Sequence, residues 1–205
     1  AANALPAALF LFYVNHNLGA SEYGGTLLLI YFCSAILATP FWIFLSNKMA
    51  KHRLWCYSMI YASGVFISTL FFGVGDWDLF LIVCILSGFA LSADLAIPAS
   101  IQADLIDLEV LRSGLRRTGA FFSVWSVATK GAVAISSGLS LMLLAWTGFT
   151  NSNENSDLSL TLLSVLYGFI PVLLKIIAIK IMWDFQLNFQ EHEKIRRTLS
   201  GRDID

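Results

Sequence analysis

The sequence predicts an all-α membrane protein with six transmembrane helices. Of its 205 residues, 57% are hydrophobic and only 13% are charged, whereas soluble domains carry about 25% charged residues. The hydrophobic residues fall into six runs, at 1–14, 25–45, 55–75, 79–102, 119–147 and 158–183. Helices are expected rather than strands, because an isolated strand cannot satisfy its backbone hydrogen bonds in lipid.

The first run, at 1–14, is shorter than the other five. Roughly 20 helical residues are needed to cross the hydrocarbon core of a bilayer. The run lacks a leading methionine, a basic segment and a small-residue cleavage site, so it does not resemble a signal peptide. We interpret it as a spanning helix of which the sequence contains only the second part.

The loops alternate in charge. Those after the second, fourth and sixth runs contain Lys or Arg, whereas the three other loops contain neither. Basic loops stay in the cytoplasm, so we expect a multi-pass protein of the cell inner membrane with a cytoplasmic C-terminus. The predicted organisation is a bundle over 1–183 followed by a cytoplasmic tail over 184–205.

Composition also argues against several functions. A formal net charge of −1 and the lack of a basic face argue against a nucleic-acid partner. The three cysteines lie in apolar runs without metal-ligand or disulfide spacing, and the three histidines are scattered. We therefore expect neither a metal site nor a cofactor, and read the cysteines as core residues.

Lys130 is the most informative position. It lies thirteen residues after Arg117, which is about 20 Å along a helix axis, and a charge at such a depth costs at least about 2.5–3.5 kcal/mol. One helix face, about 60° wide, carries a polar stripe consisting of Gly119, Ser123, Ser126, Lys130 and Ser137. The stripe predicts a helix that lines an aqueous path. A lysine with a structural role, buried or reaching to the surface, is the alternative.

Asp94 is the expected partner of Lys130. It precedes Asp104 by ten residues, about 15 Å along a helix, so its depth is similar. Charged side chains within a membrane usually pair, and we hypothesise an Asp94–Lys130 pair on the substrate or cation path. Alternatively, Asp94 binds water or backbone near the helix break expected at Pro98.

The stretch "ADLIDLEVLRSGLRRTGAFF", 103–122, concentrates charge between two apolar runs. Ion pairs there would hold the cytoplasmic ends of two helices together in one conformation and release them in another. The predicted gate consists of Asp104, Asp107, Arg112, Arg116 and Arg117. The alternative is ordinary anchoring, in which exposed pairs are worth less than about 1 kcal/mol.

Two other features of the run 119–147 have more than one interpretation. The small residues of "GAVAISSG", 131–138, predict close helix packing. Trp125 could stack on a substrate ring in the predicted path or fill space between helices.

The segment "SADLAIPASIQADLIDLEVLRSGLRRTGAFFSVWSVATKGAVAI", 92–135, resembles the region between the tenth and eleventh helices of the glycoside–pentoside–hexuronide:cation symporter family, which includes the melibiose permease. The matching positions are Asp104, Asp107, Gly114, Arg116, Arg117, Gly119, Phe122 and Lys130. Leu108, Val110 and Thr118 depart from the family pattern. Leu95 replaces a tryptophan that contacts the sugar in the melibiose permease.

The resemblance implies a major facilitator fold, of which this chain would be the C-terminal half, helices seven to twelve. It also implies coupling to sodium, protons or lithium, with most cation ligands in an N-terminal six-helix half that the sequence does not contain. By the same resemblance, Lys130 would lie near the substrate and cation region.

We therefore expect cation-coupled symport of a sugar or glycoside by alternating access between two halves. A transporter of the same fold for another solute, such as a lipid or an organic anion, is the first alternative. An intramembrane enzyme using Asp94 and Asp104 as acid and base is the second. The spans contain no GxGD, HExxH or GxSxG motif, so we do not expect an enzyme.

Overall fold

The computed structural model of the chain describes residues 1–113, 118–150 and 155–184, with no account of the side chains of 111–113. All regular structure in these ranges is helical. The α-helices are α1 (Ala4–Phe12), α2 (Gly24–Ser46), α3 (Lys51–Ser68), α4 (Trp77–Ser113), α5 (Thr118–Trp146), α6 (Asp157–Ser164) and α7 (Ile170–Trp183). A π-helical turn, Tyr13–Asn17, extends α1, and another, Val165–Phe169, joins α6 to α7. Short 3-10 turns occupy Ser21–Tyr23 and Thr69–Phe71.

Five helical segments are long and apolar enough to cross a membrane. They are Ser21–Ser46, Lys51–Phe71, Trp77–Val110, Thr118–Trp146 and Asp157–Trp183. They coincide with the last five predicted runs, so the all-α membrane class is confirmed. With its π-helical extension, α1 ends at Asn17 and is shorter than these segments. The predicted tail over 184–205 lies outside the described residues, except for Asp184.

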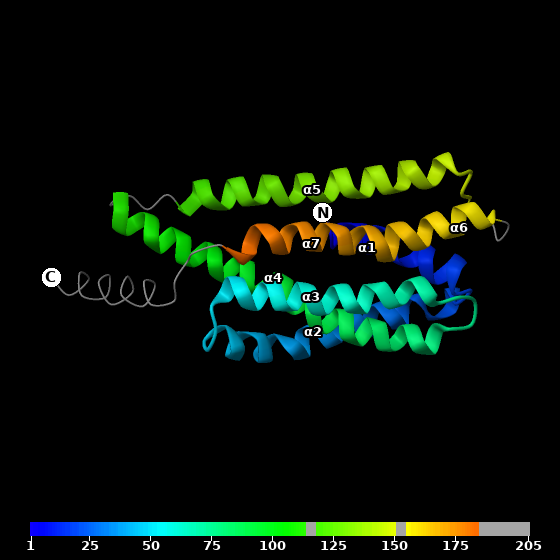
Figure 1. Cartoon of the computed structure of the whole chain (residues 1–205), viewed down its shortest axis with the longest axis horizontal. Coiled ribbons are helices and arrows are strands. Elements are labelled where there is room, and N and C mark those ends of the chain that lie inside the picture. The colour runs from blue at the N-terminus through cyan, green and yellow to red at the C-terminus, as the bar shows by residue number, and fades with distance from the viewer. Residues whose placement is uncertain (114–117, 151–154, 185–205) are drawn as a thin grey trace.

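The helices run up and down along one long axis (Figure 1). The loop between α2 and α3 lies at the same end of the bundle as the C-terminal ends of α4 and α7 (Figure 1). The loop between α3 and α4 lies at the opposite end, as do the C-terminal ends of α1 and α5 (Figure 1). The helix ends that precede the basic loops of the sequence therefore share one end of the bundle, as the alternation of the loops predicts. That this end faces the cytoplasm stays a prediction.

The tightest helix packing joins α2 to α4. A Cβ atom on Gly88 would lie 2.3 Å from the backbone oxygen of Tyr31, so only glycine fits at this crossing. Nearby, the Trp42 indole N–H donates to the carbonyl of Phe89 over 2.8 Å. Such close approach through small residues is typical of helices packed in membranes.

A second tight region joins α1, α4 and the π-helical turn before α7. The rings of Tyr13 and Tyr167 stack at 4.3 Å with an interplanar angle of 11°, and both rings are buried with Phe80. The Tyr13 hydroxyl donates to the carbonyl of Thr69. This core fixes α1 against α4 and α7.

Helix α5 lies along the edge of the bundle (Figure 1). Its buried side chains are Ser136, Ser140 and Leu144, all in its second half, while residues of the first half are exposed or half-buried. A Cβ atom on Gly131 or Gly138 would meet no atom within 4 Å. The described residues leave open space at these two glycines, whereas Ser136 of the same stretch is buried. Close packing along the whole stretch 131–138 stays a prediction.

Candidate functional site

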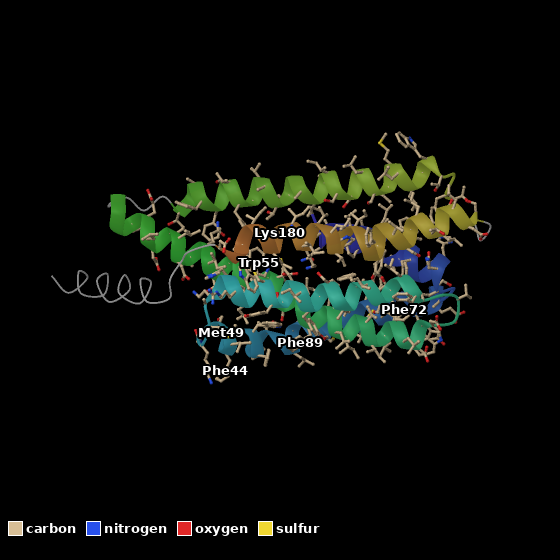
Figure 2. The ribbon with its side chains drawn as sticks, viewed as in Figure 1. Phe44, Met49, Trp55, Phe72, Phe89 and Lys180 are labelled. Atoms are coloured by element: carbon tan, nitrogen blue, oxygen red, sulfur yellow. The ribbon has the colours of Figure 1, made fainter. Side chains whose placement is uncertain are left out.

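Three helices and the residue before α1 bring polar groups together around Asp94. Its Oδ1 accepts a hydrogen bond from the Trp55 indole N–H of α3 over 2.8 Å. Its Oδ2 accepts from Lys175 Nζ of α7 over 3.0 Å and from Asn3 Nδ2 over 2.8 Å. Figure 2 shows Trp55 in the region where α3, α4 and α7 meet.

The Asp94–Lys175 ion pair is buried. The side chain of Lys175 is 4% exposed and that of Asp94 is 9% exposed. Removing two charges from water is costly, and their attraction offsets that cost only when further hydrogen bonds satisfy the charged atoms. Asp94 has such bonds from Trp55 and Asn3, whereas Asp94 is the only recorded partner of Lys175 among the described residues.

Lys175 was missed by the sequence analysis. It lies within the apolar stretch "IPVLLKIIAIKIMW", nine residues before Asp184, which is about 13 Å along a helix axis. That depth is close to the one inferred for Asp94. The signal was of the same kind as for Lys130, a lysine inside a spanning run, although this run also contains Lys180. Applying one criterion to every span would have included Lys175.

The structure corrects the predicted partner of Asp94. Lys130 is exposed on α5, and Asp94 binds Lys175 instead. The physical reason is position, because α5 lies at the edge of the bundle while α7 packs against α3. Of the predicted stripe, Ser123 is exposed and Ser126 is half-buried. A role for these residues in the substrate path stays a prediction.

A cavity of about 220 Å³ adjoins the ion pair, and we call it the pair cavity. Asp94, Lys175 and Asn3 line one part of it, and aromatic rings including Phe10 and Phe66 line another. Ligand sites of this kind combine an apolar wall with a few well-placed polar groups. The pair cavity therefore suits a compact charged group attached to an apolar one.

A larger cavity of about 600 Å³ lies between α4 and α5, and we call it the α4–α5 cavity. Its wall is mostly apolar, and Trp125 contributes to it. Gln102 and Glu109 are the polar exceptions apart from the tryptophan indoles. The ring of Trp55 also lines this cavity while its N–H bonds Asp94, which lines the pair cavity. Trp55 thus stands between the two spaces.

One residue of the predicted gate contacts a lysine that the sequence analysis did not include. Lys51 Nζ lies 2.8 Å and 2.6 Å from the two carboxylate oxygens of Asp104. This ion pair joins the start of α3 to α4. Asp107 is half-buried on the same helix. Arg116, Arg117 and the side chain of Arg112 lie outside the described residues. Gating by this region therefore stays a prediction, with Lys51 added.

The arrangement of the two carboxylates does not suit acid–base catalysis. Asp94 and Asp104 are ten residues apart on α4, and each is paired with a lysine of a different helix. A general acid and a general base must both reach the reacting atoms. In the described ranges, no three His, Cys, Asp or Glu side chains are grouped to hold a metal ion.

Fold and site together define a multi-pass helical membrane protein with a charged pair inside its bundle. Residues 1–189 match the family model described as MFS/sugar transport protein. The chain belongs to this family, and so to the major facilitator superfamily. It is therefore a member of a family of transporters rather than of enzymes, and the fold is consistent with half of a major facilitator fold.

Two curated relatives come from Xenopus tropicalis. The chain is 23% identical to the sodium-dependent lysophosphatidylcholine symporter 1, over 96% of this chain and 39% of the relative. It is 25% identical to the sphingosine-1-phosphate transporter MFSD2B, over 84% of this chain and 34% of the relative. The chain thus spans less than two fifths of the length of either. The resemblance found in the sequence is confirmed for the superfamily, but not for the melibiose permease-like family.

Proposed function

We propose that the chain is the C-terminal half of a secondary active transporter for a charged single-chain lipid. In this proposal, transport is coupled to Na⁺ or protons and proceeds by alternating access. The observation that carries it is the buried Asp94–Lys175 pair in an otherwise largely apolar cavity. The printed names of the two relatives, one a lysophosphatidylcholine symporter and one a sphingosine-1-phosphate transporter, support a lipid rather than the sugar first expected.

The α4–α5 cavity also favours a lipid over a sugar. Apart from Gln102, Glu109 and the two indoles, its wall offers hydrocarbon. A sugar in such a space would leave hydroxyl groups without partners, each at a cost of about 1–3 kcal/mol. An acyl or alkyl chain has no polar groups that need partners there and gains from burial of its surface.

In the same proposal, the polar stripe of α5 faces the path between the two halves. Lys130, Ser123 and Ser126 are incompletely covered by the described helices, and an N-terminal half would complete their surroundings. The basic loops of the sequence support a cytoplasmic position for the shared end of α2, α4 and α7 in an inner-membrane protein. Asp104, Asp107 and Lys51 would then belong to a cytoplasmic gate.

The test is uptake by the full-length protein reconstituted in liposomes. Radiolabelled lysophosphatidylcholine, sphingosine 1-phosphate and melibiose would be supplied separately, with inward gradients of Na⁺, protons or K⁺. Lipid uptake would be measured as label that albumin cannot extract. We expect cation-driven uptake of a lipid and none by residues 1–205 alone. Uptake of melibiose without either lipid would contradict the proposal.

A further inference from the structure

We infer that the Asp94–Lys175 pair selects a zwitterionic lipid headgroup, one that carries both a phosphate and a quaternary ammonium group. The phosphate would lie beside Lys175 and the ammonium beside Asp94, within the pair cavity. This inference rests on the proposed function and deepens it by naming the headgroup and a residue for each of its charges. No coupling cation is assigned to the pair.

The two charges of the pair face one cavity and cancel each other. Asp94 and Lys175 both line the pair cavity, and their side chains are 9% and 4% exposed. A ligand with a single charge would leave this buried site charged overall, which is unfavourable. A zwitterionic headgroup adds no net charge. Lying antiparallel to the ion pair, it would place each of its charges next to the opposite charge of the protein.

Lys175 can bind a phosphate without releasing Asp94. Its ammonium group carries three N–H donors, and one bond from it, to Asp94 Oδ2, is recorded among the described residues. Phosphate oxygens form short, strong hydrogen bonds to an ammonium group. The buried ion pair can therefore stay intact while the phosphate binds.

Asp94 favours an ammonium group that has no N–H donors. Trp55, Asn3 and Lys175 already donate to its carboxylate, which offers about four acceptor sites in all. A primary ammonium brings three N–H donors and would leave some of them unsatisfied in a mostly apolar cavity, which weakens binding. A quaternary ammonium has no N–H groups and needs only the negative charge.

Aromatic rings complete the surroundings that a quaternary ammonium requires. Such groups bind over the faces of aromatic rings, which attract a cation. The rings that line the pair cavity are those of Phe10, Tyr31, Phe32, Phe66 and Tyr167. The methyl groups of a quaternary ammonium also suit this wall, because their burial next to hydrocarbon is favourable.

The experiment measures the dissociation constants of four lipids, all with the same acyl chain, for the purified full-length protein in detergent. Lysophosphatidylcholine carries a phosphate and a quaternary ammonium, and lysophosphatidylethanolamine carries a phosphate and a primary ammonium. Lysophosphatidic acid carries the phosphate alone, and monoacylglycerol carries no charge. The variants are Asp94→Asn, Lys175→Gln and the double substitution. Lys180→Gln is the matched control, since Lys180 is an exposed lysine on the same helix (Figure 2).

The unaltered protein should bind lysophosphatidylcholine about tenfold or more tightly than each of the other three lipids. Lys175→Gln should weaken that binding by roughly ten- to a hundredfold, the loss expected for hydrogen bonds to a charged group. Asp94→Asn should make lysophosphatidic acid the tighter of the two phosphate lipids without a primary ammonium, because Lys175 then has no negative partner in the protein. Monoacylglycerol binding should be the same in every variant, and Lys180→Gln should behave as the unaltered protein.

Three results would overturn the inference. They are equal binding of lysophosphatidylcholine and lysophosphatidylethanolamine by the unaltered protein, unchanged lysophosphatidylcholine binding in Lys175→Gln, and a persisting preference for lysophosphatidylcholine over lysophosphatidic acid in Asp94→Asn. Should a single variant fail to fold, the neutral double variant decides the matter. It should retain monoacylglycerol binding and bind lysophosphatidylcholine no more tightly, and a persisting preference for lysophosphatidylcholine would overturn the inference. The comparison of the two zwitterionic lipids needs no variant.

Failure of the inference can be distinguished from failure of the proposed function. Cation-driven lipid uptake by the unaltered protein, with the same headgroup preference in all variants, would contradict the inference but not the proposed function. Tightest binding of lysophosphatidic acid by the unaltered protein would do the same. Lack of binding of all four lipids and of sphingosine 1-phosphate would contradict both.

Discussion

Lys175 Nζ lies 3.0 Å from Asp94 Oδ2, and this ion pair links α7 to α4. Neither side chain is more than 9% exposed. Each residue alone would be an uncompensated charge inside the bundle. Each therefore depends on the other for its stability, and the local packing of α3, α4 and α7 depends on both.

The first prediction concerns the stability of this pair. Asp94→Asn or Lys175→Met alone should lower the free energy of unfolding by about 3–5 kcal/mol, because each leaves a buried charge without a partner. The double variant should be more stable than either single variant. Thermal unfolding of the full-length protein in detergent measures this. If the double variant loses as much unfolding free energy as the two single variants together, the two charges are not coupled.

The second prediction concerns the crossing of α2 and α4. Gly88→Ala places a Cβ atom 2.3 Å from the backbone oxygen of Tyr31, so a helix must shift, and overpacking of this kind costs about 1–3 kcal/mol. Gly64→Ala is the matched control, since a Cβ there meets nothing within 4 Å. Unfolding temperatures of both variants check this. Equal effects of the two substitutions would contradict the packing described for Gly88.

The third prediction concerns the contact between Lys51 and Asp104. Their side chains are 20% and 12% exposed, and Lys51 contacts both carboxylate oxygens. If the contact belongs to a gate, Lys51→Gln should change the uptake rate several-fold while substrate affinity stays the same. Lys48→Gln is the control, because Lys48 in the loop just before α3 lies over the ring of Phe44, 4.2 Å from its centroid. A change confined to substrate affinity would contradict a gating role.

The sequence predicts the helical class and the spans because both follow from composition and run length. The alternation of basic loops also predicts which helix ends lie together, as Figure 1 shows. Asp94 could be identified as a candidate site residue because a carboxylate inside an apolar run is rare. Its partner could not, because Lys130 and Lys175 lie at similar depths and only the arrangement of the helices distinguishes them.

Glycine positions illustrate the same limit. The small residues at 131–138 suggest a packed face, yet a Cβ atom on Gly131 or Gly138 would meet no described atom within 4 Å, whereas Gly88 stands at the tightest crossing. Which small residue is covered depends on helix rotation and on neighbours distant in the sequence. The hydrogen bond from Trp55 to Asp94 could not be predicted either, since a tryptophan near the end of a span is common in membrane proteins.

The last prediction concerns Trp55, which donates its indole N–H to Asp94 Oδ1 over 2.8 Å. Trp55→Phe keeps an aromatic ring against the α4–α5 cavity and removes only this donor. We expect the preference for lysophosphatidylcholine over lysophosphatidylethanolamine to fall several-fold, since the carboxylate loses one of its donors and can accept from a primary ammonium instead. Trp42→Phe is the control. It removes a similar indole bond, to the carbonyl of Phe89, and should affect stability but not this preference. If both variants show the same preference as the unaltered protein, Trp55 holds Asp94 for structural reasons only, and the ring between the two cavities has no part in headgroup selection.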